Sequence, residues 1–320
     1  MTNKINLLIT GGAGFIGSNL VEHFLNDDRV ALIRVLDDLS NGYYENIQEF
    51  ENHPKFEFIQ GDICDYETCL KACEGIHKIS HQAALGSVPR SIENPMRTNE
   101  VNVGGTVNIL NAAKEKGVDR IVLAFSSSTY GDHQGLPKVE DEIGKPLSPY
   151  AVSKLAIEQY AEVFGRIHGL EWVGFRYFNI FGPKQNPDNP YAAVIPIFCK
   201  AFIEDKEITV YGDGETSRDF TFVDNAVLLN DLGLFTENKA ALNQIYNGAC
   251  GDQISLNDMV LILEEIAGKT VKVNHGPERP GDVRHSKANI AKVRKLLGYK
   301  PIVNFQDGLQ RVYTWYQERE

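Results

Sequence analysis

The chain has 320 residues, of which 42% are hydrophobic and 23% are charged, a composition typical of a soluble globular protein that can bury a sizeable core. The net charge of −11 argues against a nucleic-acid partner, which would require a basic face. No apolar run near the N-terminus is long enough for a signal peptide or a membrane span, and the five cysteines are odd in number and lack Cys-x-x-Cys spacing. We therefore expect reduced thiols, no metal site, no membrane association and a cytoplasmic location.

The first half of the chain alternates short apolar strands with helices. The sequence predicts strands over residues 5–9, 32–36, 56–60, 78–82 and 120–125, and helices over residues 15–25 and 101–116. This alternation predicts an α/β fold with a doubly wound parallel sheet. Ligands of such folds bind outside the carboxyl ends of the strands, so motifs that follow strand ends should converge on one cleft.

The composition changes after about residue 180. Residues 183–190 read Pro-Lys-Gln-Asn-Pro-Asp-Asn-Pro, and the predicted strands beyond them are short and separated. We interpret residues 1–180 as a cofactor-binding domain and residues 181–320 as a smaller lobe. We expect this lobe to close over the cleft and to be interleaved with the first domain.

A glycine-rich turn follows the first strand, with Gly11, Gly14 and Gly17 spaced three apart where a helix begins. Glycine lets the turn tighten, lets the backbone approach a pyrophosphate and lets the helix pack on the strand. The helix N-terminus then faces the phosphates. Asp37 lies 20 residues after Gly17, where an acid accepts ribose hydroxyls and repels a 2′-phosphate. The pattern predicts a dinucleotide site that prefers NAD to NADP.

A second motif combines a tyrosine, a lysine and a run of serines. Residues 150–154 read Tyr-Ala-Val-Ser-Lys, and a Ser-Ser-Ser run occupies 126–128. Tyr150 and Lys154, four apart, share one face of a helix, and a nearby ammonium lowers the pKa of a tyrosine from about 10. A serine hydroxyl can hold a substrate oxygen while the tyrosine moves the proton. We therefore predict a redox site with Tyr150, Lys154 and either Ser126 or Ser127 as catalytic residues.

Further motifs are Gly-Asp-Ile at 61–63, His-Gln-Ala-Ala at 81–84, Ser-Ser-Ser-Thr-Tyr-Gly at 126–131, Arg-Tyr-Phe-Asn at 176–179 and Ser-Arg-Asp-Phe at 217–220. With these motifs the chain resembles, essentially end to end, the extended short-chain dehydrogenase/reductase family and its NAD-dependent nucleotide-sugar epimerases. Residues 126–154 and the run Arg-Pro-Gly-Asp-Val-Arg-His-Ser at 279–286 are most similar to the bacterial UDP-N-acetylglucosamine 4-epimerases.

The resemblance implies a Rossmann-type domain that binds NAD and a smaller lobe that binds a UDP-sugar. The implied cofactor contacts are Gly11, Gly14, Phe15, Ile16, Gly17, Asp37, Asn41, Asp62, Ile63, Ala83, Ala84, Asn102, Tyr150, Lys154 and Tyr177. The implied substrate contacts are Ser87, Ser128, Asn179, Ala193, Val194, Tyr211, Arg218, Arg279, Asp282 and Ser286. The two arginines suit a diphosphate because a guanidinium binds phosphate oxygens bidentately.

The implied reaction is a 4-epimerisation. Tyr150 takes the proton of the C4 hydroxyl while the hydride goes to NAD, the 4-keto sugar turns over, and the hydride returns to the opposite face. A 4,6-dehydratase would need a further acid and base, and the Ser-Ser-Ser-Thr of residues 126–129 supplies no carboxylate. A UDP-glucuronate or UDP-glucose 4-epimerase, a nucleotide-sugar reductase and a non-catalytic NAD-binding protein remain alternatives.

Two finer expectations concern the sugar and the assembly. Ser286 aligns with the family position that limits the sugar pocket, where a tyrosine restricts epimerases to sugars without an acetyl group. Because Ser286 and Ala193 are small, we expect room for a 2-acetamido group and hence a preference for UDP-GlcNAc and UDP-GalNAc. The family also implies a homodimer formed through the helices near residues 101–116 and 151–168.

Overall fold

The computed structural model describes residues 4–186, 193–278 and 284–319. In these residues a seven-stranded sheet has the order β11-β6-β5-β4-β1-β2-β3, and each neighbouring pair is parallel. The strands are β1 (Ile5–Thr10), β2 (Val30–Asp37), β3 (Phe56–Gln60), β4 (Lys78–His81), β5 (Arg120–Ser126), β6 (Glu171–Tyr177) and β11 (Gln244–Gly248). The predicted α/β fold is confirmed, and the five predicted strands occur within two residues of their expected ends.

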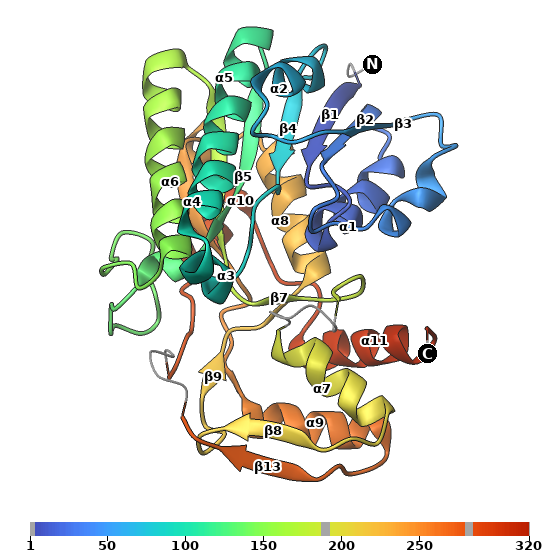
Figure 1. The fold of residues 1–320 in the computed structure, drawn as a ribbon. Helices are drawn as coiled ribbons and strands as arrows, with labels where there is room; N and C mark the ends of the chain where they lie inside the picture. The colour runs from blue at the N-terminus through green and yellow to red at the C-terminus, as the bar shows by residue number, and fades with distance from the viewer. Residues whose placement is uncertain (1–3, 187–192, 279–283, 320) are drawn as a thin grey trace.

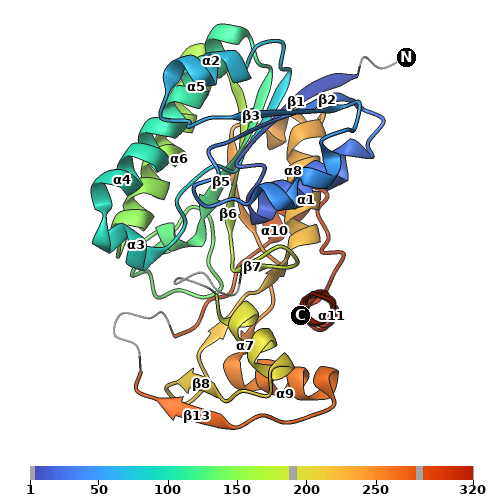
Figure 2. The ribbon, with the colours of Figure 1, turned by 45° about the vertical axis from the view of Figure 1, so that its right-hand side comes forward.

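Helices cover both faces of this sheet, as Figures 1 and 2 show. One face packs on α2 (Tyr66–Ala72), α5 (Thr106–Lys116) and α6 (Pro149–His168). The other packs on α1 (Phe15–Leu25), α8 (Val223–Phe235) and α10 (Ala291–Leu297). A parallel sheet covered on both sides requires strands that are apolar along their whole length, which explains the nearly continuous burial of the Arg120–Ser126 strand.

The helix predicted over residues 101–116 begins differently in the structure. A π-helical turn, η3 (Glu100–Gly105), leads directly into α5. A Cβ on Gly105 would lie 2.5 Å from the Ile63 side chain. Glycine at this position therefore lets the π-helical turn pack against the loop that follows β3. In the same turn Asn102 binds the backbone of Leu85 through both its oxygen (2.8 Å) and its nitrogen (3.2 Å). A π-type turn inside a helix is often found at a functional site.

The smaller lobe lies beneath the carboxyl ends of the strands (Figure 1). Its own apolar core joins α7 (Val194–Ile203), α9 (Leu256–Ala267) and α11 (Phe305–Gln317). Three two-stranded sheets complete it: β7 (Ile180–Phe181) with β10 (Thr221–Phe222), β9 (Ser217–Arg218) with β12 (Ile254–Ser255), and β8 (Ile208–Tyr211) with β13 (Val273–Gly276). The remaining short helices are α3 (Val88–Glu93), α4 (Pro95–Asn99), η1 (Tyr44–Asn46), η2 (Gln48–Phe50), η4 (Ser127–Tyr130) and η5 (Lys239–Ala241).

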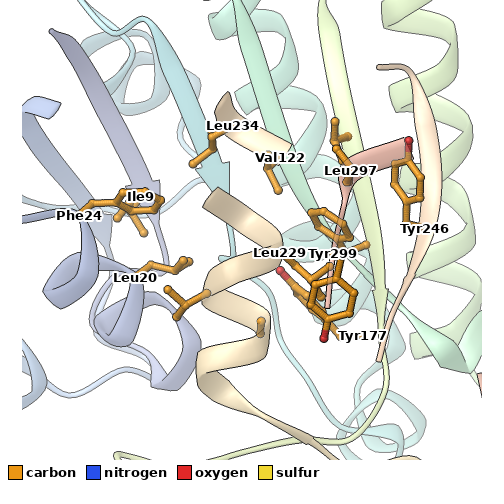
Figure 3. Close-up of a cluster of buried hydrophobic side chains, with 14 of the residues drawn as sticks. Ile9, Leu20, Phe24, Val122, Tyr177, Leu229, Leu234, Tyr246, Leu297 and Tyr299 are labelled. Carbon is orange, nitrogen blue, oxygen red and sulfur yellow. The ribbon is translucent and has the colours of Figure 1, made fainter. Parts of the chain in front are cut away.

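Three elements that follow residue 181 in the chain return to the large sheet. Strand β11 pairs with β6, and α8 and α10 pack on the face that also receives α1. Figure 3 shows Leu229 and Leu297 in this cluster beside Tyr177 and Tyr246. The division into residues 1–180 and 181–320 stays a prediction. After residue 181 the chain passes between the smaller lobe and the large sheet more than once.

Candidate active site

A cleft of about 530 Å³ lies along the carboxyl ends of the strands. The strand order places β2 and β3 on one side of β1, and β4, β5, β6 and β11 on the other. The crevice outside β1 is where parallel sheets of this order bind ligands. Residues after β2 and β3 line one end of the cleft, which we name the adenosine end. Residues after β5 and β6 line the other, which we name the catalytic end.

The glycine turn has no room for side chains. A Cβ on Gly17 would lie 2.0 Å from the Gly11 carbonyl oxygen, and a Cβ on Gly11 would lie 2.7 Å from the Ala83 nitrogen. Gly11 also has a φ of 69°, in the left-handed region that favours glycine. Helix α1 has Gly14 as its N-cap and no side-chain cap, so its first amides are available at the cleft and are suited to a pyrophosphate. The turn therefore fits a dinucleotide.

Asp37 lies at the end of β2 and fixes the backbone around this turn. Its carboxylate accepts hydrogen bonds from the amides of Ala13 and Leu39, both at 2.9 Å. Burial raises the pKa of Asp37, and these amides oppose the rise. The side chain also lines the cleft, and a carboxylate has lone pairs left for two ribose hydroxyls.

Asp62 and Asn41 complete the adenosine end. Desolvation would raise the pKa of Asp62, but the amide of Cys64 and the guanidinium of Arg97 hold it below its usual value. Arg97 Nη2 lies 2.9 Å from the Asp62 carboxylate, and Arg90 Nη2 donates to Asn41 Oδ1 at 3.2 Å. These partners orient both side chains at the rim of the cleft.

Behind Ala83 and Ala84 a buried histidine sets the backbone of the loop after β4. Thr106 Oγ1 donates its one hydrogen to the Asn102 carbonyl at 2.6 Å. It therefore accepts a hydrogen bond from His81 Nε2, which lies 2.9 Å away. His81 Nδ1 then accepts from Thr10 Oγ1 at 2.7 Å. Burial lowers the pKa of His81 to about 3, which is consistent with this neutral ring.

The catalytic end brings Tyr150, Lys154 and Ser126 together. Tyr150 and Lys154 lie one turn apart on α6, with the lysine ammonium 5.9 Å from the centre of the tyrosine ring. Lys154 Nζ donates to the Ala124 carbonyl at 2.8 Å. Burial lowers the pKa of Lys154 to about 8 and Glu158 opposes this. Burial also raises the pKa of Tyr150, while a hydrogen bond with Ser126 lowers it. Ser127 lines the same end.

A buried ion pair supports Lys154 from behind. Glu158 lies one turn further along α6 and binds Arg176 through both carboxylate oxygens, each at 2.8 Å. Arg176 also donates to the Glu140 carbonyl at 2.8 Å, and it stacks 4.9 Å above the ring of Tyr130. The pair joins the catalytic helix to the loop after η4 and keeps the charge of Glu158 compensated.

Tyr177 ends β6 at the wall of the catalytic end. Its hydroxyl accepts from Asn230 Nδ2 at 2.6 Å, and Asn230 Oδ1 accepts from Ser80 Oγ at 2.9 Å and from Gln82 Nε2 at 3.1 Å. Gln82 also lines the cleft. This network locks the ring of Tyr177 between the sheet and α8.

The predicted cofactor residues almost all reach the cleft. The lining includes every one of them except Asn102, whose buried amide holds Leu85 and also donates to Ser153 Oγ at 3.0 Å. All four predicted catalytic residues, Ser126, Ser127, Tyr150 and Lys154, line it too.

The predicted substrate residues are more scattered. Asn179 and Ala193 line the cleft, whereas Ser87, Ser128, Val194, Tyr211, Arg218 and Ser286 do not. Arg279 and Asp282 fall outside the described residues. Ser87 caps α3 by accepting from the Arg90 amide at 3.2 Å, and Tyr211 is exposed at the end of β8. Ser128 Oγ is buried without a hydrogen-bond partner in the described chain.

One buried acid ties the substrate segments together. The Asp219 carboxylate accepts from the amides of Cys250, Gly251 and Ala288 at 3.0–3.1 Å, and its carbonyl accepts from Asn179 Nδ2 at 3.0 Å. Burial raises the pKa of Asp219 to about 7, opposed by these three donors. Asn179, Arg218 beside Asp219, and the segment that carries Ser286 are thereby held in one arrangement.

Sequence reasoning missed other residues that line the cleft. They include Tyr43, Asn46, Gln82, Lys184, Gln185 and Asn186. Gln82 sits inside a recognised motif and was open to prediction, but the others belong to segments without a chemical signature.

In the part of the chain that the structure describes, no helix combines the length and the apolar character needed to cross a membrane.

Comparisons with known proteins agree with this geometry. The family model described as GDP-mannose 4,6 dehydratase matches residues 8–312. A solved UDP-N-acetylglucosamine 4-epimerase from Methanobrevibacter ruminantium, in complex with UDP-N-acetylmuramic acid, has a TM-score of 0.93 at 33% identity and covers 99% of this chain and 100% of that one. The chain belongs to the extended short-chain dehydrogenases/reductases and their NAD-dependent nucleotide-sugar epimerases.

Other members of the family are equally similar and differ in the sugar. The UDP-glucose 4-epimerase of Thermus thermophilus in complex with NAD has a TM-score of 0.87 at 34% identity, covering 98% of this chain and 99% of that one. The UDP-glucuronate 4-epimerase of Thermodesulfobacterium geofontis is 34% identical over 97% of this chain and 96% of its own length. Identity at this level establishes the epimerase family and leaves the sugar open.

The site also separates this epimerase from the dehydratases for which the family model is named. The acids that line the cleft, among residues the structure describes, are Asp37, Asp38 and Asp62. All three follow β2 or β3 and lie at the adenosine end, across β1 from Tyr150. No described carboxylate lines the catalytic end to remove a C5 proton or a C6 hydroxyl.

Proposed function

We propose that this NAD-dependent UDP-sugar 4-epimerase interconverts UDP-GlcNAc and UDP-GalNAc. The observation that carries the choice of sugar is the small side chain at two positions of the substrate end. Ala193 lines the cleft just before α7. Ser286 does not line it, but the resemblance to the epimerases implies that this position limits the sugar pocket. Together they leave volume for a 2-acetamido group.

The position of Ser286 supports this assignment. Its amide donates to the Ser217 carbonyl at 3.0 Å, so the segment runs beside β9 and next to Arg218. The neighbouring His285 Nδ1 lies 2.7 Å from Ser217 Oγ. The backbone of residue 286 is thus held beside the proposed diphosphate contact, where a larger side chain would reduce the space for the sugar.

The residues of the catalytic end would perform the proton transfer. NAD, when bound, supplies the hydride acceptor and donor. Tyr150 would take the proton of the C4 hydroxyl and return it after the sugar has turned. The Lys154 ammonium favours the phenolate form of Tyr150. Ser126, which shares a hydrogen bond with Tyr150, would hold the same substrate oxygen, and we assign it this role ahead of Ser127.

Substitution of Ser286 tests the sugar preference. Ser286→Tyr should reduce kcat/KM for UDP-GlcNAc at least tenfold by steric clash and spare UDP-glucose, because a small group in a fitted pocket contributes about 1–3 kcal/mol. Ser286→Ala is the matched control, since it removes the hydroxyl and keeps the volume. Rates for UDP-GlcNAc, UDP-GalNAc, UDP-glucose and UDP-glucuronate would be measured by resolving the products. Wild-type turnover of UDP-GlcNAc by the tyrosine variant, or a native preference for UDP-glucuronate, would contradict the assignment.

We also propose a homodimer formed through α6 and α5. Four exposed apolar residues, Val152, Tyr160, Val163 and Ile167, recur along α6 at helical spacing and form a stripe on the face away from the sheet. A second copy of the chain would cover this stripe by pairing the same helices. Light scattering should give twice the 35.7 kDa chain mass, and a monomer at micromolar concentration would exclude the dimer.

A further inference from the structure

A short segment of the smaller lobe lies across the glycine turn. Asn19 of α1 donates to the Pro183 carbonyl at 3.4 Å, and Asn186 Nδ2 donates to the Tyr43 hydroxyl at 2.6 Å. From the other side the Tyr316 hydroxyl of α11 donates to the Gln185 carbonyl. We name residues 183–186 the cleft clasp, because they connect α11 to the loop after β2 and three of them line the cofactor cleft.

Lys184 is the most constrained residue of the cleft clasp. Its φ of 71° is uncommon for a residue with a side chain and persists only where the surroundings fix it. Its side chain is 12% exposed, and Nζ donates to Glu22 Oε2 at 3.0 Å and to the Asn46 carbonyl at 3.4 Å. The ammonium is therefore held between α1 and η1, while the Glu22 carboxylate is 55% exposed and screened by water.

The charged residues around the cleft indicate what this lysine does. Among the described lining residues the cations are Lys154 and Lys184. Lys154 is tied to Ala124 at the catalytic end, so Lys184 is the described lining cation on the side of the glycine turn. A helix N-terminus provides about half a positive charge, which leaves most of the charge of a pyrophosphate uncompensated. Asp37 and Asp62 make the adenosine end more negative still.

We propose that Lys184 is a cofactor-retention residue and that the cleft clasp slows the release of NAD. Lys184 lines the cleft, so its ammonium would add positive charge near the NAD pyrophosphate, and the clasp would hold α11 and the loop after β2 together beside the bound cofactor. The inference rests on the proposed function in one respect: a 4-epimerase returns its hydride to the sugar in every cycle, so its NAD need not leave. It does not depend on which sugar is bound.

The rate of NAD exchange tests this proposal without any sugar. Purified protein loaded with radiolabelled NAD would be mixed with excess unlabelled NAD, and the label retained would be followed after gel filtration. Lys184→Met should release NAD at least about tenfold faster, and Tyr43→Phe, which removes only the hydroxyl bound by Asn186, about threefold faster. Lys206→Met is the matched control: its side chain is 67% exposed and pairs with Glu204. It should exchange at the wild-type rate.

Two further readouts separate retention from a general loss of structure. Exchange from the wild type should accelerate with salt, because salt screens the ammonium, and Lys184→Met should respond less. Activity of Lys184→Met lost on gel filtration should return on addition of NAD. If Lys184→Met does not fold, Lys184→Arg, which keeps the charge, should retain NAD and Tyr43→Phe should still release it faster. Wild-type exchange in both Lys184→Met and Tyr43→Phe, or equal acceleration in Lys206→Met, would overturn the proposal. Neither outcome would bear on the sugar assignment.

Discussion

At the adenosine end of the cleft the binding groups follow the ends of neighbouring parallel strands, whereas at the substrate end they come from segments far apart in the chain. Gly11, Asp37 and Asp62 lie at or just after the ends of β1, β2 and β3, and the sheet itself places them in a row. Asn179, Arg218 and Ser286 are brought together by Asp219 and by pairing of two-residue strands. The first arrangement is fixed by the fold of one unit, and the second by long-range hydrogen bonds between loops.

The comparison shows why the two ends differ in chemistry. Cofactor recognition uses backbone amides and close backbone approach, so it tolerates few changes at the glycines and more changes at the neighbouring side chains. Substrate recognition uses side chains on short elements, so a change of one residue can alter the sugar while the fold stays the same. The relatives at 33–34% identity, which are named for three different sugars, follow this expectation.

The largest effect is expected at the catalytic end, where the two halves meet. Tyr150→Phe should keep the fold and the NAD content but reduce kcat by at least about two orders of magnitude, the scale for loss of a general acid–base group. Tyr160→Phe is the control, because Tyr160 lies outside the cleft and the change keeps the ring in the proposed dimer contact. The NAD released on denaturation should be near one per chain in both variants. Full activity of Tyr150→Phe would transfer the proton step to Ser126 or Ser127.

A second prediction concerns the stability of the large sheet that holds the cofactor cleft. His81 is buried as a neutral ring, and its pKa in the folded protein, about 3, lies below its ordinary value of 6.5. Its contribution is present above pH 6.5 and is lost as the pH falls toward 3, because the unfolded chain binds the proton first. The free energy of unfolding should fall by about 3 kcal/mol between pH 6.5 and pH 4 on this account.

Denaturant titrations across this pH range check the prediction. His81→Gln should flatten the pH dependence, and His168→Gln, on the exposed end of α6, should not. An unchanged slope in His81→Gln would assign the acid sensitivity to other groups.

The smallest effect is expected at the substrate end. Arg218→Ala should raise KM for the UDP-sugar about tenfold, since one charge-assisted hydrogen bond contributes about 1.5–3 kcal/mol. Turnover should change less, because phosphate contacts persist from ground state to transition state. Arg319→Ala, near the end of α11, is the matched control, and Arg279→Ala should behave like Arg218→Ala. A loss of kcat at unchanged KM would place Arg218 in the chemistry and weaken the contrast between the two ends.

Sequence patterns predicted most of the fold because strand and helix periods are local properties. The glycine turn and Asp37 carried their own structural context, so their place in the cleft followed from spacing. The π-helical turn at Glu100–Gly105 was not predicted, since it depends on the approach of Gly105 to Ile63. Lys184 was passed over because its position depends on contacts with Glu22 and Asn46, which no local pattern encodes. Ser87 was assigned to the substrate by resemblance, and here it caps a helix.

The return of late elements to the large sheet has a consequence for synthesis of the chain. Tyr299 and Leu297 are buried in the same cluster as Ile9 and Val122 (Figure 3), and β11 forms the edge beside β6. The chain must therefore have emerged from the ribosome to about residue 299 before this face of the sheet is covered. Until then the nascent chain exposes an apolar face and an unpaired strand edge, the features that make folding intermediates prone to aggregate. A chain stopped near residue 180 would keep its nucleotide motifs and lack the core that holds them in place.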